Sequence, residues 1–370
     1  MRVLFCTNVP SPYRVNFFNE LGKLCDLTVT FEKRTSNERD KSWKDYSFEN
    51  FTGIFLRSFS IRTDMAVSFD LKRIIKNGRF DVIVLTNIMS PSIWLAVSFL
   101  RKKGIEYYIE GDGRFAKKTV GFRGLIKQYC IKGATAFFTT SEEHEKSYRL
   151  SGAGGPFYRY PFTSLYQSDI LSEPINANDK LLLRKELNLI EDKIVLSVGR
   201  FSYNKGYGKG YDTLMKVAEI SSKDIGFYII GDDPTEEFLH WKEQSGLTNV
   251  HFLPFMKKNE LFMYYRAADI SVLLTRGDVW GLVVEEAMAN GLPVIATDKC
   301  LAATAIIRNG ENGYIVPVDS PGETRDVLMK YLLEDEKKAV LSKACINSIG
   351  KYTIENMANY HMSIFSQKKE

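Results

Sequence analysis

The sequence predicts an α/β protein made of two successive halves, each built around a parallel sheet. Short apolar runs alternate with segments of helical period along the whole chain, as in consecutive βα units. The alternation pauses once, between residues 158 and 179, where two prolines and several serine and asparagine residues interrupt it. A chain of 370 residues is long for one domain and comfortable for two.

The expected elements follow the chain in order. In the first half, strands are expected near residues 3–6, 27–31, 54–59, 82–85, 107–109 and 136–139, with helices near 14–24, 66–76, 91–103, 122–132 and 142–150. In the second half, strands near 194–198, 227–230, 250–252, 270–274, 293–296 and 314–316 alternate with helices, and residues 354–365 have helical period. We therefore expect a first domain over 1–165, a linker over 166–179, a second domain over 180–350 and a helical tail over 351–370.

Composition narrows the class of protein. Hydrophobic residues make up 44% and charged residues 26%, as in soluble globular proteins, and a net charge of +5 is too small to indicate a nucleic-acid partner. The five cysteines are scattered without CxxC or Cys/His spacing, so we expect reduced thiols, no metal site and no cofactor. No apolar run approaches the roughly 18 residues of a membrane span. We expect a cytoplasmic protein, at most peripheral at the membrane.

Residues 278–297 (DVWGLVVEEAMANGLPVIAT) read as a loop, a short helix, a Gly-Leu-Pro break and a strand. A glycine where the loop enters the helix lets a ligand approach the backbone closely. The first turn would offer the amides of Gly281, Leu282 and Val283, an arrangement that favours a phosphate. Asp278 and Glu286 would place a carboxylate on either side of it. The alternative is an ordinary buried helix with a solvated Asp and Glu.

A second charged loop follows the predicted strand that ends at Gly199. It carries Arg200 and Lys205, and a planar guanidinium and a point charge both suit a diphosphate. Lys-Gly-Tyr occurs twice in succession here, so Lys209 is a rival for the role of Lys205.

Together these elements resemble those of retaining glycosyltransferases of family four, which have an E-x7-E donor motif and a Gly-Arg-x4-Lys-Gly element. The chain has the aromatic residue (Trp280), the following Gly-Leu and Glu286-Ala-Met-Ala, but Asp278 replaces the first glutamate. The resemblance implies the GT-B fold: two Rossmann-like domains facing across a cleft, with the C-terminal helix packing back on the first. It also implies metal independence.

The same resemblance implies site roles in the second, nucleotide-sugar-binding domain. Arg200 and Lys205 would hold the diphosphate, Glu286 the ribose, and Asp278 or Trp280 the sugar. The nucleobase would lie near Phe252 and Leu253. The implied reaction transfers a hexose from a nucleotide diphosphate sugar, UDP-sugar favoured, to a hydroxyl acceptor with retention.

The first domain is expected to bind the acceptor through loops that follow two strands. Tyr13 and Arg14 open a helix after the first strand; the alternative is a simple helix-starting turn. In Glu110-Gly-Asp112-Gly-Arg114, the carboxylates could orient the acceptor hydroxyl or take its proton, and Arg114 could contact the acceptor. The alternative is a turn with solvated carboxylates. The Gly-Gly loop and His-Asp pair of many family members are absent.

Basic residues cluster after this loop, and they are Lys117, Lys118, Arg123, Lys127 and Lys132. They form either a solvated helix face or, with Phe122 and Leu125 beside them, a patch for anionic lipid or an acceptor diphosphate. Ser141 is expected to cap the next helix. His144 is expected on that helix's surface.

The Tyr-Pro-Phe-Thr-Ser linker and the Trp-Gly-Leu-Val-Val run resemble those of glycosyltransferases of bacterial surface-polysaccharide assembly. The expected partners are therefore a nucleotide diphosphate sugar, a glycan or lipid-linked acceptor, and the cytoplasmic membrane surface. Two alternatives stay open: a sugar-nucleotide epimerase of GT-B fold, and a non-catalytic nucleotide-sugar-binding partner of another transferase.

Overall fold

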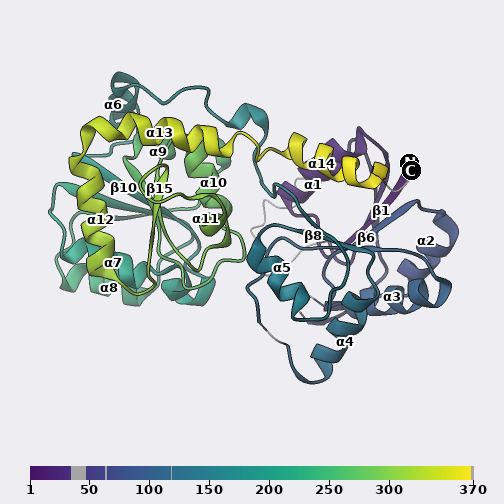
Figure 1. The fold of residues 1–370 in the computed structure, drawn as a ribbon. Coiled ribbons are helices and arrows are strands. Elements are labelled where there is room, and N and C mark those ends of the chain that lie inside the picture. The colour runs from purple at the N-terminus through teal and green to yellow at the C-terminus, as the bar shows by residue number, and fades with distance from the viewer. Residues whose placement is uncertain (35–46, 63–64, 118, 368–370) are drawn as a thin grey trace. The chain divides into compact units, whose positions relative to one another are not determined.

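The computed structural model describes residues 1–34, 47–62, 65–117 and 119–367 (Figure 1). The chain divides into two compact units. Unit 1 comprises Met1–Tyr166 and Tyr352–Glu370, and unit 2 comprises Gln167–Lys351. Each unit is built on one parallel sheet, so the expected α/β class with two parallel-sheet halves is confirmed.

Unit 1 has a seven-stranded sheet in the order β3-β2-β1-β6-β7-β8-β9. Its strands are β1 (Arg2–Thr7), β2 (Asp26–Phe31), β3 (Thr52–Phe55), β6 (Val82–Leu85), β7 (Tyr108–Glu110), β8 (Ala136–Thr139) and β9 (Phe157–Arg159). Its helices are α1 (Pro12–Gly22), α2 (Asp70–Gly78), α3 (Pro91–Lys103), α4 (Gly121–Lys132), α5 (Glu142–Arg149) and α14 (Ile354–Gln367). A separate antiparallel pair is formed by β4 (Phe59–Arg62) and β5 (Met65–Val67).

Unit 2 has a six-stranded sheet in the order β12-β11-β10-β13-β14-β15. Its strands are β10 (Lys193–Val198), β11 (Ile225–Ile230), β12 (Val250–Leu253), β13 (Ile270–Leu273), β14 (Val294–Thr297) and β15 (Gly313–Val316). Its helices are α6 (Ala177–Glu186), α7 (Tyr211–Glu219), α8 (Glu236–Gln244), α9 (Lys258–Ala267), α10 (Leu282–Ala289), α11 (Leu301–Ile306), α12 (Pro321–Leu333) and α13 (Asp335–Ile349), with short 3-10 segments at Gln167–Asp169 and Tyr203–Lys209.

The order of strands reverses once in each sheet. In unit 1 the reversal lies between β1 and β6, and in unit 2 it lies between β10 and β13. Loops that leave the carboxyl ends of such a pair diverge to opposite faces, which opens a crevice where ligands bind. This rule points to the loops that follow β10 and β13 in unit 2.

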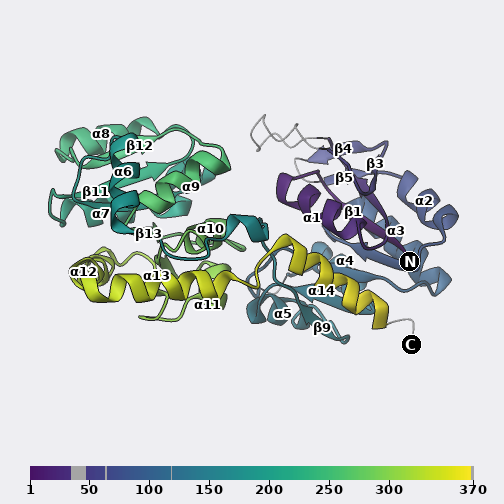
Figure 2. The same cartoon turned by 90° about the horizontal axis from the view of Figure 1, so that it is seen from above.

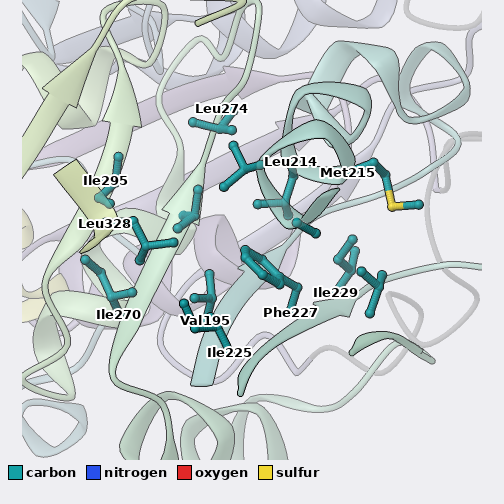
Figure 3. Close-up of a cluster of buried hydrophobic side chains, with 14 of the residues drawn as sticks. Val195, Leu214, Met215, Ile225, Phe227, Ile229, Ile270, Leu274, Ile295 and Leu328 are labelled. Atoms are coloured by element: carbon teal, nitrogen blue, oxygen red, sulfur yellow. The ribbon is translucent and has the colours of Figure 1, made fainter. Parts of the chain in front are cut away.

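Helices cover both faces of each sheet, which explains why the strands are apolar along nearly their whole length. In unit 2, α9, α10 and α13 lie on one side of the strands and α7 and α8 on the other (Figure 1). Figure 3 shows part of the core, in which Val195, Phe227 and Ile270 from three neighbouring strands lie below Leu214 of α7.

The last helix, α14, packs against α1 of unit 1 (Figure 2). The expected return of the tail to the first half is therefore confirmed. One expected strand is divided: β3 ends at Phe55, and Phe59 begins β4, where its ring is largely exposed. Leu56 continues inward but the chain then turns away from the sheet.

Candidate active site

The loop after β10 is held against the neighbouring strand end. Gly199 N donates to Ile230 O at 3.0 Å, and the Asp232 carboxylate accepts from the amides of Phe201 and Ser202. The loop then passes through left-handed backbone at Asn204, Lys205 and Gly206. Arg200 and Lys205 are both exposed at this edge of the sheet.

Lys209, rather than Lys205, reaches the second charged loop. Its Nζ lies 2.5 Å from Oδ2 of Asp278, and both side chains are mostly buried. Two further bonds join the same loops, because Gly208 O accepts from Thr275 Oγ1 at 2.9 Å and from Arg276 N at 3.0 Å. The loops after β10 and β13 therefore form one cluster at the switch point of the sheet.

The backbone before α10 is fixed on its other side by the loop after β14. Asp278 N donates to Lys299 O at 2.8 Å, and Ala302 N donates to Trp280 O at 2.8 Å. Gly281 has φ of 101°, and a Cβ there would lie 2.5 Å from Cys300 Sγ. Glycine is thus required twice over, by the left-handed backbone and by the close approach.

Helix α10 begins directly after Gly281, and no side chain caps its first turn. The amides of Leu282 and Val283 stand at this start, where the helix dipole favours an anion. Glu286, one turn further on, is partly buried and accepts from Tyr265 Oη at 3.5 Å. The start of α10, Asp278 and Glu286 thus belong to the same loop and helix, as expected.

The Trp280 side chain does not lie at this surface. It is only 2% exposed, and its Nε1 donates to the buried Glu285 at 2.8 Å. Trp280 therefore anchors the loop to α10 from inside, and its indole is not placed to touch a sugar. Glu285 thus faces the interior, whereas Glu286 is partly exposed.

Phe252 and Leu253 end β12, which is separated from β13 by the two strands β11 and β10. The Phe252 ring meets Phe201 edge to face at 5.6 Å between centroids. The Leu253 carbonyl accepts from Gly231 N at 3.1 Å. Both residues are partly buried, and Phe252 contacts the loop that carries Arg200.

The acceptor candidates of unit 1 form an internal ion-pair network. Arg14 is buried, and its guanidinium donates to Glu110 and to Asp112. Tyr13 Oη donates to Asp112 Oδ2 at 3.1 Å. The other Glu110 oxygen lies 2.9 Å from His361 Nε2 on α14.

This network corrects the expected role of Glu110 and Arg14. Burial raises the pKa of Glu110, but Arg14 and His361 outweigh it and lower the pKa to about 2. A buried carboxylate held by two partners is not available to take a proton from an acceptor. Asp112 remains partly exposed, although Arg14 and Tyr13 also hold it.

His361 is the site residue that we missed from the sequence. It lies on α14 among Ile354, Met357, Ala358 and Phe365, all of them buried. Those positions repeat at helical spacing, and His361 falls on the same face of the helix. A histidine on a buried helix face indicates an internal polar contact.

The expectation for His144 was wrong, because this residue is buried. Burial, reinforced by Arg114 and Lys127, lowers the pKa of His144 to about 3. Ser141 caps α5 as expected, with Oγ accepting from His144 N at 3.2 Å. Lys118 lies outside the described residues.

Solved structures show the class of fold. HepE from Anabaena, in complex with UDP, aligns over 99% of this chain and 100% of that chain, with a TM-score of 0.78 and 13% identity. WaaG, a glycosyltransferase involved in lipopolysaccharide biosynthesis, aligns over 98% and 99%, with a TM-score of 0.70 and 16% identity. The fold is that of GT-B proteins.

Sequence comparison identifies relatives of this chain among glycosyltransferases. Residues 179–347, most of unit 2, match the family model described as "Glycosyl transferases group 1". An uncharacterized glycosyltransferase of Haemophilus influenzae is 35% identical over 146 residues, which are 38% of this chain and 39% of the relative. The lipopolysaccharide glucosyltransferase WaaG of Escherichia coli is 24% identical over 255 residues, 64% and 68% of the two chains.

A protein in the cps region of Klebsiella pneumoniae is 26% identical over 208 residues, which are 56% of this chain and 53% of the relative. The chain thus spans less than two thirds of the Haemophilus and Klebsiella relatives. Residues 179–347 are thus similar to group 1 glycosyltransferases.

The described residues contain no helix long and apolar enough to cross a bilayer. They also contain no group of three or more His, Cys, Asp or Glu side chains that could hold a metal ion.

Proposed function

We propose that the protein is a retaining glycosyltransferase that moves a hexose from a nucleotide diphosphate sugar, with UDP-sugar favoured, to a hydroxyl acceptor. The observation that carries the proposal is the cluster at the switch point of unit 2. There Lys209, Asp278 and the uncapped start of α10 meet at the carboxyl edge of the sheet. HepE, which has the same fold, was solved with UDP and with UDP-glucose.

The cluster suits a leaving diphosphate. Arg200 and Lys209 supply positive charge, and the amides at residues 281–283 face the negative charge that grows on the departing oxygen. Asp278 orients the Lys209 ammonium, so we assign the diphosphate to Lys209 rather than to Lys205. Exposed Lys205 lies further along the same loop.

The two carboxylates serve the sugars of the donor. Glu286 would accept hydrogen bonds from the ribose hydroxyls, and Asp278 from the hexose. The proposed reaction is a front-face displacement. The bond between the anomeric carbon and the diphosphate oxygen breaks while the acceptor oxygen bonds to the anomeric carbon from the same face of the sugar. The acceptor proton passes to the departing phosphate oxygen, so no protein base is required.

Unit 1 would bind the acceptor. Because Glu110 and Arg14 are internal, the residues left for acceptor contacts are Tyr13, Asp112 and Arg114, which are partly exposed. They follow β1 and β7, at the carboxyl edge of the unit 1 sheet.

A lipid-linked glycan at a membrane surface fits the outer face of α4. Val120, Phe122 and Leu125 are largely exposed there, and Arg123 stands between two of them. Exposed apolar side chains beside basic ones favour the surface of an anionic bilayer. WaaG is a lipopolysaccharide glucosyltransferase and the Klebsiella relative lies in a cps region, which supports a role of this protein in bacterial polysaccharide assembly.

Calorimetry with UDP, GDP and ADP tests the donor site. We expect selective binding of UDP by the wild type and losses of at least tenfold in Arg200→Ala and in Glu286→Ala, since each removes a contact worth about 1.5–3 kcal/mol. Exposed Lys216→Ala, on the distal part of α7, is the control. The proposal is contradicted if no nucleotide binds, or if nucleotide affinity is the same in both variants as in the wild type.

Product analysis separates the remaining alternatives. An epimerase converts a UDP-sugar without any acceptor. A non-catalytic partner binds the nucleotide but turns over no acceptor.

A further inference from the structure

Lys127 is a buried basic residue on the inward face of α4. The buried positions of this helix are Gly124, Lys127, Cys130 and Ile131, which repeat at helical spacing. Lys127 is only 1% exposed, and its Nζ has no hydrogen-bond partner among the described residues. Its position on the buried face corrects its expected place on a solvated basic face.

Lys127 lies near a second cation and a histidine. Burial first, and then the nearby Arg114 guanidinium, lower the pKa of Lys127 to about 8. His144 Nδ1 accepts from Thr140 N at 3.4 Å, so the neutral ring carries its proton on Nε2. Both Arg114 and Lys127 lie within electrostatic reach of His144.

His144 and Tyr148 lie against the loop after β7, which carries Arg114. A Cβ built on Gly111 would lie 3.0 Å from His144 Nε2 and 3.0 Å from Tyr148 Oη, so both groups lie against that loop. Three carboxylates of this region have other partners: Glu110 pairs with Arg14 and His361, Asp112 pairs with Arg14 and Tyr13, and Glu143 accepts from Ala116 N at 3.1 Å.

A buried ammonium without a counter-ion is costly, and a second cation nearby raises that cost. An anion among Lys127, Arg114 and His144 would remove it. The loop also stands at the carboxyl edge of a parallel sheet, where ligands of such folds bind.

We propose that Lys127, Arg114 and His144 form a subsite of unit 1 that binds a phosphate group. Given the proposed transferase function, on which this assignment rests, the phosphate belongs to the acceptor. It would be carried either by a lipid headgroup or by a soluble phosphorylated glycan.

Thermal unfolding in inorganic phosphate tests the subsite. The titration runs at constant ionic strength with saturating UDP, so that the phosphate-binding part of unit 2 is occupied. We expect a saturable rise in Tm for the wild type and for Lys102→Met, an exposed lysine of unit 1. We expect no rise for Lys127→Met. An equal rise in Lys127→Met overturns the proposal.

Arg114→Gln gives a second, independent variant, because this loop side chain is partly exposed and its loss should leave the fold intact. We expect it to weaken the phosphate effect severalfold; an unchanged effect in this variant also counts against the subsite. If UDP fails to bind while the effect of Lys127 persists, the proposed function is wrong and the anion subsite stands.

Vesicle sedimentation distinguishes the two sources of phosphate. Vesicles of phosphatidylcholine alone are compared with vesicles that also contain phosphatidylglycerol. Weaker binding of Lys127→Met to phosphatidylglycerol vesicles assigns the subsite to a lipid headgroup. Equal vesicle binding together with a lost effect of inorganic phosphate assigns it to a soluble acceptor, and no loss in either assay overturns it.

Discussion

Units 1 and 2 carry charged side chains at the same end of similar parallel sheets, but they use them differently. In unit 2, Arg200 and Lys205 are exposed, and Lys209 pairs with Asp278 at the edge. In unit 1, Arg14 and Glu110 are buried and paired with each other, and Glu110 also contacts His361 of the C-terminal helix α14.

The difference shows that a charged residue after a strand has two possible uses. When a partner of opposite charge comes from a distant helix, the residue becomes part of the core. When the neighbours are glycines and an uncapped helix start, the charge stays available to a ligand.

Arg14→Met should have the largest effect on stability. It leaves the Glu110 carboxylate in the interior with one partner fewer, and breaking a buried pair costs about 3–5 kcal/mol. Urea unfolding measures the loss. UDP binding by the folded fraction should match that of the wild type, and a loss smaller than about 1 kcal/mol would contradict a structural role for the network.

Lys209→Met should act mainly on ligand binding. We expect UDP affinity to fall about ten- to a hundredfold, the equivalent of one charged hydrogen bond. The free energy of unfolding should fall by less than in Arg14→Met, because Asp278 keeps some exposure to solvent. Lys205→Met is the matched control and should change UDP affinity less than about threefold. If calorimetry shows a larger loss of UDP affinity in Lys205→Met than in Lys209→Met, then Lys205 holds the diphosphate.

The pH dependence of stability should report the unit 1 network. Its Glu110 carboxyl has a pKa lowered from 4.5 to about 2, so its contribution is complete above pH 4.5 and is lost as pH falls towards 2. We expect the advantage of the wild type over Glu110→Gln in unfolding free energy to shrink by about 2 kcal/mol between pH 5 and pH 3. A gap that stays constant over this range would refute the ionised pair.

Phe122→Ser should have the smallest effect on the folded protein. The ring is 75% exposed, so stability should change by less than about 0.5 kcal/mol. Binding to phosphatidylglycerol vesicles should fall about tenfold, because an aromatic side chain loses its burial in the interface. Phe69→Ser, at a ring that is 71% exposed elsewhere in unit 1, is the control and should bind vesicles as the wild type does.

Periodicity located most of the fold. The expected strands at 82–85 and 136–139 coincide with β6 and β8, and the helix at 91–103 coincides with α3. Such runs are set by local pattern. The strand order could not be read locally, because the pairing of β10 with β13 joins segments that are separated by two whole βα units.

The contacts of the site residues were harder to predict, because they also join segments that are distant in the sequence. The position of Glu110 depends on Arg14 and His361, which lie 96 and 251 residues away in the sequence. The choice between Lys205 and Lys209 depends on left-handed turns that shape the intervening loop. Two residues carried a local signal that the sequence analysis did not use. Lys127 is in phase with the buried positions Gly124 and Ile131, and His361 is in phase with Met357 and Phe365.

The return of the chain to unit 1 has a consequence for the order of biosynthesis. The chain leaves unit 1 at residue 166 and comes back at 352, so the ribosome delivers all of unit 2 before α14. Until then, Phe17 and Phe138 lack the His361 ring that lies 4.9 Å and 4.5 Å from theirs. Unit 1 is therefore begun first and finished last. A nascent chain released before α14 carries all of unit 2 but an unfinished first unit, whose uncovered aromatic cluster marks it for chaperones and proteases.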